Sequence, residues 1–197
     1  RCEGIVLLHH GLFTFAEDAR TSYERTIELV TRAERYLAEH GGAPPPLLAA
    51  APRLAPREAR GELAAALPRV RGALALRDAG GEIAQRFVAS ARTSDDLRAF
   101  SEQPAARALV EDEGPLTPDH VLRTKGPYLF LARAEWGEPH AVASAVPCYE
   151  QRYREYFAAH RVRVAGAREL DPRPRVALLE GLRLSGFGPD ARAAAIA

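Results

Sequence analysis

The first forty residues combine two short apolar runs with one longer stretch of helical spacing. Residues 5–8 are apolar and lead into two histidines and a glycine, and residues 12–15 favour extended structure. This pattern predicts two short strands, or one strand with a sharp bend. Asp18 can then cap a helix whose apolar residues recur down to about Gly41. We expect this helix to have about six turns.

Residues 41–56 interrupt the regular patterns. They contain a Gly-Gly pair and five prolines, which can hold neither a regular helix nor a central strand. The sequence therefore predicts a proline-rich linker at 41–56, with one region at 1–40 and another at 57–197.

Beyond the linker, helical and extended patterns alternate. Helical spacing is expected over residues 57–77, with a kink at Pro68, and a turn follows at residues 78–81. The remaining predicted elements are a strand at 83–90, a short helix from Ser94 or Asp95 to Phe100, a helix beginning at Thr117-Pro118, a strand at 128–132, a turn at 136–139, a helix at 141–160, a strand at 176–179 and a helix from Pro189. The aromatic stripe of the 141–160 helix, at Tyr149, Tyr153, Tyr156 and Phe157, is interpreted as core packing.

An internal repeat links the two ends of the chain. Residues 6–12 (VLLHHGL) and 176–182 (VALLEGL) agree at five of seven positions, by identity or aliphatic exchange. Each copy is followed by a segment with Ala-Arg, at Ala19 and at Ala191. We therefore predict the same strand, bend and helix in both copies. In this alignment Glu180 takes the place of His10, and we expect its carboxylate to be solvated or paired with an arginine.

Composition narrows the class of protein. Lys+Arg of 27 and Asp+Glu of 26 give a formal net charge of +1, so neither nucleic acid nor membrane is an expected partner. Lys125 is the single lysine beside 26 arginines, which indicates a bacterial coding bias. Cys2 and Cys148 are expected to be reduced thiols of a cytoplasmic protein. The chain has no methionine, and we expect it to be an internal fragment whose natural start lies upstream.

The first copy resembles the class II aldolase and adducin-like family. In that family a zinc-binding histidine ends an apolar strand just before a glycine, as His10 does before Gly11. The segments 10–37 and 114–125 are similar to bacterial bifunctional proteins in which a rhamnulose-phosphate aldolase region precedes a short-chain dehydrogenase. The resemblance implies that His10 is a zinc ligand, whereas the family's His-x-His pair and a further carboxylate lie upstream of this chain. His9 should point to the opposite side of the strand and is left out of the site.

The resemblance also implies the fold. We expect an α/β, class II aldolase-like layered sheet with helices, made of the C-terminal strand and helix of one domain (1–40) and a degenerate second copy (57–197). The second copy has Glu180 in place of a histidine. His120, Arg123 and Lys125 are interpreted as solvated side chains, in preference to an anion-binding cluster.

The function expected from the resemblance is zinc-dependent retro-aldol cleavage of a deoxyketose phosphate, with zinc stabilising the enediolate that forms. NAD would act only in a dehydrogenase domain outside this chain, since no Gly-x-Gly-x-x-Gly is present. The fragment alone is expected to be inactive, and no catalytic residue is assigned within it. Two alternatives remain open, a non-catalytic adducin-like scaffold and a sugar-phosphate epimerase. The expected partner is a small sugar phosphate, and a homo-oligomer is left open.

Overall fold

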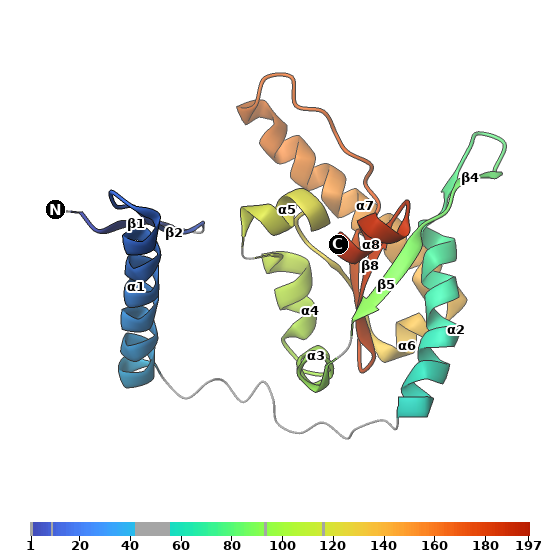
Figure 1. Ribbon diagram of the computed structural model, residues 1–197. Helices are drawn as coiled ribbons and strands as arrows, with labels where there is room; N and C mark the ends of the chain where they lie inside the picture. Colours follow the sequence, from blue (N-terminus) through green and yellow to red (C-terminus); the bar gives the residue numbers. More distant parts are fainter. Residues whose placement is uncertain (1, 9, 42–55, 93, 116) are drawn as a thin grey trace. The chain divides into compact units, whose positions relative to one another are not determined.

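The computed structural model describes residues 2–8, 10–41, 56–92, 94–115 and 117–197, and the chain divides into two compact units. Unit 1 comprises Arg1–Leu47 with Leu116–Pro118, and unit 2 comprises Leu48–Pro115 with Asp119–Ala197 (Figure 1). The predicted linker at 41–56 falls almost entirely outside the described residues.

Unit 1 is a hairpin followed by a long helix. Strand β1 (Gly4–Leu7) pairs antiparallel with β2 (Gly11–Thr14), and α1 spans Ala19–His40. Asp18 caps α1, because its carboxylate accepts a hydrogen bond from the Thr21 amide at 2.9 Å. The two predicted strands and the capped helix are thus confirmed.

Helix α1 packs on one face of this hairpin. The Thr14 hydroxyl lies 2.6 Å from the Thr26 hydroxyl and donates to the Ser22 carbonyl at 2.9 Å. Gly4 allows the close approach, because a Cβ there would lie 2.8 Å from Leu29 Cδ1. Even so, α1 has no buried residue, and none of the residues described in unit 1 is buried.

Unit 2 is built on a four-stranded sheet with the order β5-β8-β7-β6. The strands are β5 (Val88–Arg92), β8 (Arg183–Gly188), β7 (Val176–Leu179) and β6 (Leu129–Leu131). β6 runs parallel to β7, and the other two pairings are antiparallel. A small separate hairpin joins β3 (Leu76–Arg77) and β4 (Ile83–Gln85).

Helices surround the sheet. In chain order they are α2 (Pro56–Leu74), α3 (Asp95–Ser101), α4 (Ala106–Ala108) with a π-helical turn (Leu109–Glu113), α5 (Pro118–Thr124), α6 (Arg133–Trp136), α7 (Pro139–His160) with a 3-10 turn (Arg161–Arg163), and α8 (Ala191–Ile196). None of the described helices is both long and apolar enough to cross a membrane.

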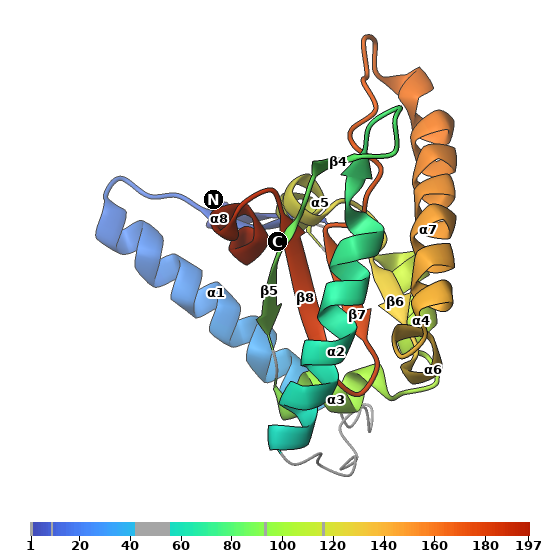
Figure 2. The ribbon, with the colours of Figure 1, turned by 90° about the vertical axis from the view of Figure 1, so that its right-hand side faces the viewer.

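The helices form layers on both faces of the sheet. On one face, α2 and α7 lie side by side and cover Leu131, Leu179 and Phe187 (Figure 2). On the other face, Ala106 of α4 and Val110 pack on Phe130 and Leu178, and α8 contacts β8 and β5. Every residue of β6 and β7 is buried, as expected for strands covered on both sides. The predicted α/β layering is confirmed in this coarse form.

Two sequence expectations need correction. The single strand predicted at 83–90 is broken, because Phe87 inserts its ring into the core and its carbonyl accepts a hydrogen bond from Arg71 Nε at 2.8 Å. The chain therefore leaves β4 and enters a different sheet at β5. The aromatic stripe of α7 is only partly core, since Tyr149 and Tyr153 are buried and Tyr156 is exposed.

Candidate functional site

The two copies of the repeat fold into the same hairpin. In unit 1, Leu7 pairs with Gly11 and its carbonyl accepts from the His10 amide at 3.1 Å. In unit 2, Leu179 pairs with Arg183 and its carbonyl accepts from the Leu182 amide at 3.0 Å. The next helices begin at Ala19 and Ala191, each capped by an aspartate. The predicted strand, bend and helix are confirmed in both copies.

The residue equivalence within the turn was predicted wrongly. The turn hydrogen bonds place Leu182 at the position of His10 and Glu180 at that of Leu8. The sequence match aligns Gly11 with Gly181, but Gly11 is the first residue of β2, whereas Gly181 lies inside the turn with φ +72°. Gly181 adopts a left-handed conformation that suits a turn. When the two copies are aligned by sequence, the turn of the second copy therefore begins two residues later than the turn of the first.

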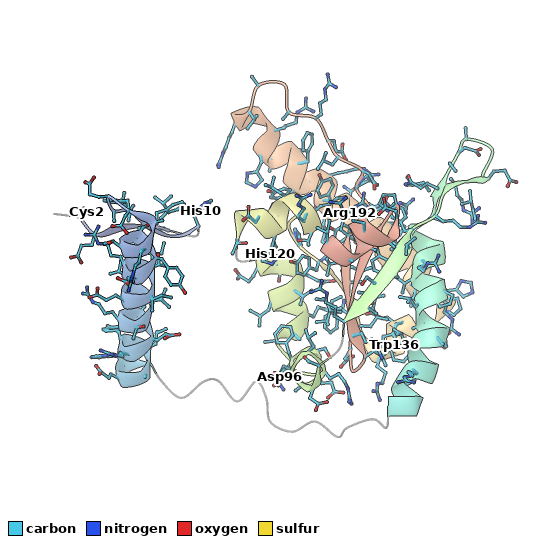
Figure 3. All side chains as sticks on the ribbon, in the orientation of Figure 1. Cys2, His10, Asp96, His120, Trp136 and Arg192 are labelled. Carbon is cyan, nitrogen blue, oxygen red and sulfur yellow. The ribbon has the colours of Figure 1, made fainter. Side chains whose placement is uncertain are left out.

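His10 lies at the tip of the unit 1 hairpin (Figure 3). Its imidazole is exposed and stacks on the Phe13 ring, with 5.7 Å between ring centroids. Among the described residues, no group of three or more His, Cys, Asp or Glu side chains could hold a metal ion. His10 can therefore supply one ligand, and the described part of the chain does not complete a zinc site. His9 lies outside the described residues.

The turn of the second copy is held by neighbouring helices. Glu180 accepts a hydrogen bond from the Arg133 amide at 2.8 Å, and its carbonyl accepts from Trp136 Nε1 at 3.2 Å. Gly181 is bonded through its amide to the Ser101 hydroxyl at 2.9 Å. The Glu180 carboxylate thus accepts a charge-assisted hydrogen bond from a backbone amide at the start of α6.

A cavity of about 410 Å³ opens between α7, β6 and the α4 region of unit 2. Its α7 wall consists of small side chains, which leave the space open: Ala141, Ser144, Ala145 and Cys148. Arg107 pairs with Glu135 at 2.5 Å, and Arg152 pairs with Glu111 at 3.0 Å. Because both guanidinium groups are engaged by carboxylates, the cavity offers no uncompensated charge for a phosphate group. Sequence reasoning missed this network; its one local signal is the spacing of four between Arg107 and Glu111.

Lys125 is not solvated, in contrast to the prediction. It is buried, adopts φ +70°, and its ammonium donates to the carbonyls of Asp171 and Arg173. The ammonium also lies 4.8 Å from the centre of the Tyr153 ring. His120 and Arg123, by contrast, are exposed. The three residues therefore do not form an anion-binding cluster. Lys125 instead ties the end of α5 to the segment that leads into β7.

Burial lowers the pKa of Lys125 to about 8, and the nearby Arg175 guanidinium acts in the same direction. Asp171 and Glu150 oppose the shift. The only sequence signal for this buried group was that Lys125 is the single lysine.

We expect the stability of unit 2 to depend on the protonation of Lys125. The folded chain releases this proton near pH 8, before the unfolded chain does at about 10.5, so the unfolded state binds more protons in between. The free energy of unfolding of the wild type should therefore rise relative to Lys125→Met by roughly 1–2 kcal/mol between about pH 7 and 10. Urea unfolding at several pH values measures this difference, and a difference that stays constant with pH would contradict the buried ammonium.

The architecture defines the class of protein to which the chain belongs. The four-stranded sheet of unit 2, which has helices on both faces and contains the second copy of the repeat, is a layered α/β domain. Residues 61–197, more than half of the chain, match the family described as Aldolase class II, second domain. The chain is a member of this family.

One curated relative is the Uncharacterized oxidoreductase YuxG of Bacillus subtilis (strain 168). The two sequences are 27% identical over 192 residues, which cover 94% of this chain and 26% of the relative. The chain thus spans about a quarter of the length of that protein. No solved structure matches the chain significantly.

Proposed function

We propose that this chain is part of the aldolase portion of a longer, zinc-dependent lyase that cleaves a deoxyketose phosphate of the rhamnulose-phosphate type. In this proposal residues 1–40 end a first aldolase-type domain, and residues 57–197 form a second one without its own zinc site. The observation that carries the proposal is the family match of the second domain, combined with a repeated hairpin whose first copy places His10 at its tip.

A second enzymatic activity in the same polypeptide also belongs to this proposal. The relative is named an oxidoreductase, and this chain corresponds to about a quarter of it. A dehydrogenase domain would oxidise the aldehyde that retro-aldol cleavage releases. NAD would be needed only there.

The chemistry that zinc supplies in such enzymes is the stabilisation of enediolate charge. In this chain His10 would hold the metal through one imidazole nitrogen, and its position at a closed hairpin fixes the direction of the side chain. Because the described residues provide no second and third ligand, no catalytic step is assigned to this chain.

A non-catalytic role is a second candidate for the second domain. The position equivalent to His10 is occupied there by Leu182, which is buried, and the turn is held by hydrogen bonds from α3 and α6. A turn fixed in this way favours a role of the second domain in assembly or support of the first. An epimerase that uses the same zinc ligand is the alternative within the enzyme class.

We expect the 197-residue chain alone to show no retro-aldol turnover, because one imidazole cannot hold zinc against water. The longer polypeptide, loaded with zinc, should cleave rhamnulose phosphate and release the aldehyde product. Both are measured by aldehyde release, with a metal-free sample as control. Turnover by the short chain above this control would contradict the assignment of the missing ligands. If the longer polypeptide epimerises the sugar phosphate without cleaving it, the proposed activity is that of an epimerase and not of an aldolase.

A further inference from the structure

The second hairpin allows a position-by-position comparison with the first one. Superposing the turns makes Leu7 equivalent to Leu179, Ile5 to Ala177 and Phe13 to Ser185. In unit 2, these positions lie on the sheet face opposite α8, under α2 and α7, and each is fully buried, with 0% exposure. In unit 1, Ile5, Leu7 and Phe13 are each 47% exposed.

The helix of each copy lies on the other face. In unit 1 that face carries Gly4 and Thr14, which touch Leu29 and Thr26 of α1. In unit 2 the position equivalent to Thr14 is Gly186, where a Cβ would lie 2.5 Å from the Ala194 carbonyl of α8. In both copies, therefore, the following helix covers the same face of the hairpin. The opposite, apolar face is also the same in both copies.

The strand edges show the same difference. In unit 2, the outer edge of β7 pairs in parallel with β6, and the outer edge of β8 pairs with β5. Within the described part of unit 1, β1 and β2 pair only with each other. An isolated two-stranded hairpin is at best marginally stable in water, and exposed strand edges favour further pairing.

We infer that the face formed by Ile5, Leu7 and Phe13 (the open hairpin face) is the docking surface for the rest of its own domain in the longer polypeptide. Its occupant has the layout of residues 56–160: a parallel strand for the edge of β1, an antiparallel strand for β2, and two helices with apolar stripes. This occupant belongs to the same longer polypeptide, so the inference rests on the proposed function in so far as this chain is part of a longer protein.

A second copy of this chain is a poorer occupant. Its own β6, α2 and α7 already cover its own β7 and β8, where Leu131, Leu179 and Phe187 are fully buried. Releasing them would expose that apolar core to water, which is unfavourable. A separate segment of the longer polypeptide has no such cost, and the relative, of which this chain covers 26%, has ample length to provide it.

Cysteine labelling of the longer polypeptide tests the inference. Leu7→Cys and Leu8→Cys are each made in a background of Cys2→Ser and Cys148→Ser. Leu7 belongs to the open hairpin face, whereas Leu8 is a turn residue, 85% exposed, and is equivalent to the partly exposed Glu180. We expect a thiol reagent to modify Leu7→Cys at least ~10-fold more slowly in the longer polypeptide than in the 197-residue chain. Leu8→Cys should react at a similar rate in both.

Each other outcome overturns the inference. Equal reactivity of Leu7→Cys in the two proteins would show that the face stays open. Protection already present in the 197-residue chain would show that the occupant lies within that chain. Protection that is lost on dilution would identify a second copy. Labelling does not require zinc or turnover, so an inactive longer polypeptide with protected Leu7→Cys would refute the aldolase proposal and leave the docking surface intact.

Discussion

Replacing His10 by alanine in the longer polypeptide should remove bound zinc and abolish retro-aldol turnover. The reason is the number of ligands: three neutral imidazoles hold the metal and leave a position open for substrate, and two hold it far more weakly. Loss of a residue that only hydrogen-bonds to a metal ligand lowers metal affinity by about 10–100-fold, so loss of a direct ligand should lower it by more than ~100-fold. Zinc content by elemental analysis and aldehyde release measure the two effects.

A matched histidine controls for non-specific loss of metal. His140, near the start of α7, is exposed and carries no metal-binding motif. His140→Ala should retain the zinc content and turnover of the wild type. If His10→Ala binds as much zinc as His140→Ala, His10 is not a ligand.

Leu131→Ala is expected to produce a large loss of stability in unit 2. Leu131 is fully buried, at 0% exposure, in the parallel strand β6, and packs in the core under α2 and α7. Truncation removes buried methyl groups and leaves a cavity between closely packed layers, which costs about 2–5 kcal/mol. Urea unfolding of the 197-residue chain measures this free energy.

Leu122→Ala is the control with the same chemical change. Leu122 lies on α5 and is 79% exposed, so its truncation removes little buried surface. Its effect should be within about 0.5 kcal/mol of zero. Equal destabilisation by the two variants would mean that the side chain of Leu131 is not part of the packed core.

Local signals in the sequence gave much of the secondary structure. Asp18 predicted the start of α1, because its short side chain can accept a hydrogen bond from a free amide of the first helical turn. The seven-residue repeat located both hairpins, since matching apolar spacing buries matching faces. The apolar run at 176–179 similarly identified β7. The family resemblance extended these local predictions to a layered sheet, and the match over residues 61–197 supports the class II aldolase assignment.

Other features depended on distant parts of the chain. The pairing of β5 with β8 joins residues 92 to 100 positions apart, and no local pattern specifies such a partner. The break at Phe87 arises from its insertion into a core formed mainly by other elements. The alternating pattern at 83–90, from which one strand was predicted, carries no information about that core.

By itself, the sequence indicated the start of α1 and the strand and bend of both repeat copies, because caps, turns and side-chain periodicity act within a few residues. It also determined that His10 follows a strand and that the two hairpins are copies. Only the tertiary structure decided that Leu182 is the counterpart of His10, since backbone hydrogen bonds set the hairpin register. The burial of Lys125 was also decided by the tertiary structure, because its ammonium donates hydrogen bonds to carbonyls of a segment more than forty residues away. Burial and register arise from contacts between distant segments, and these contacts form only when the chain is folded.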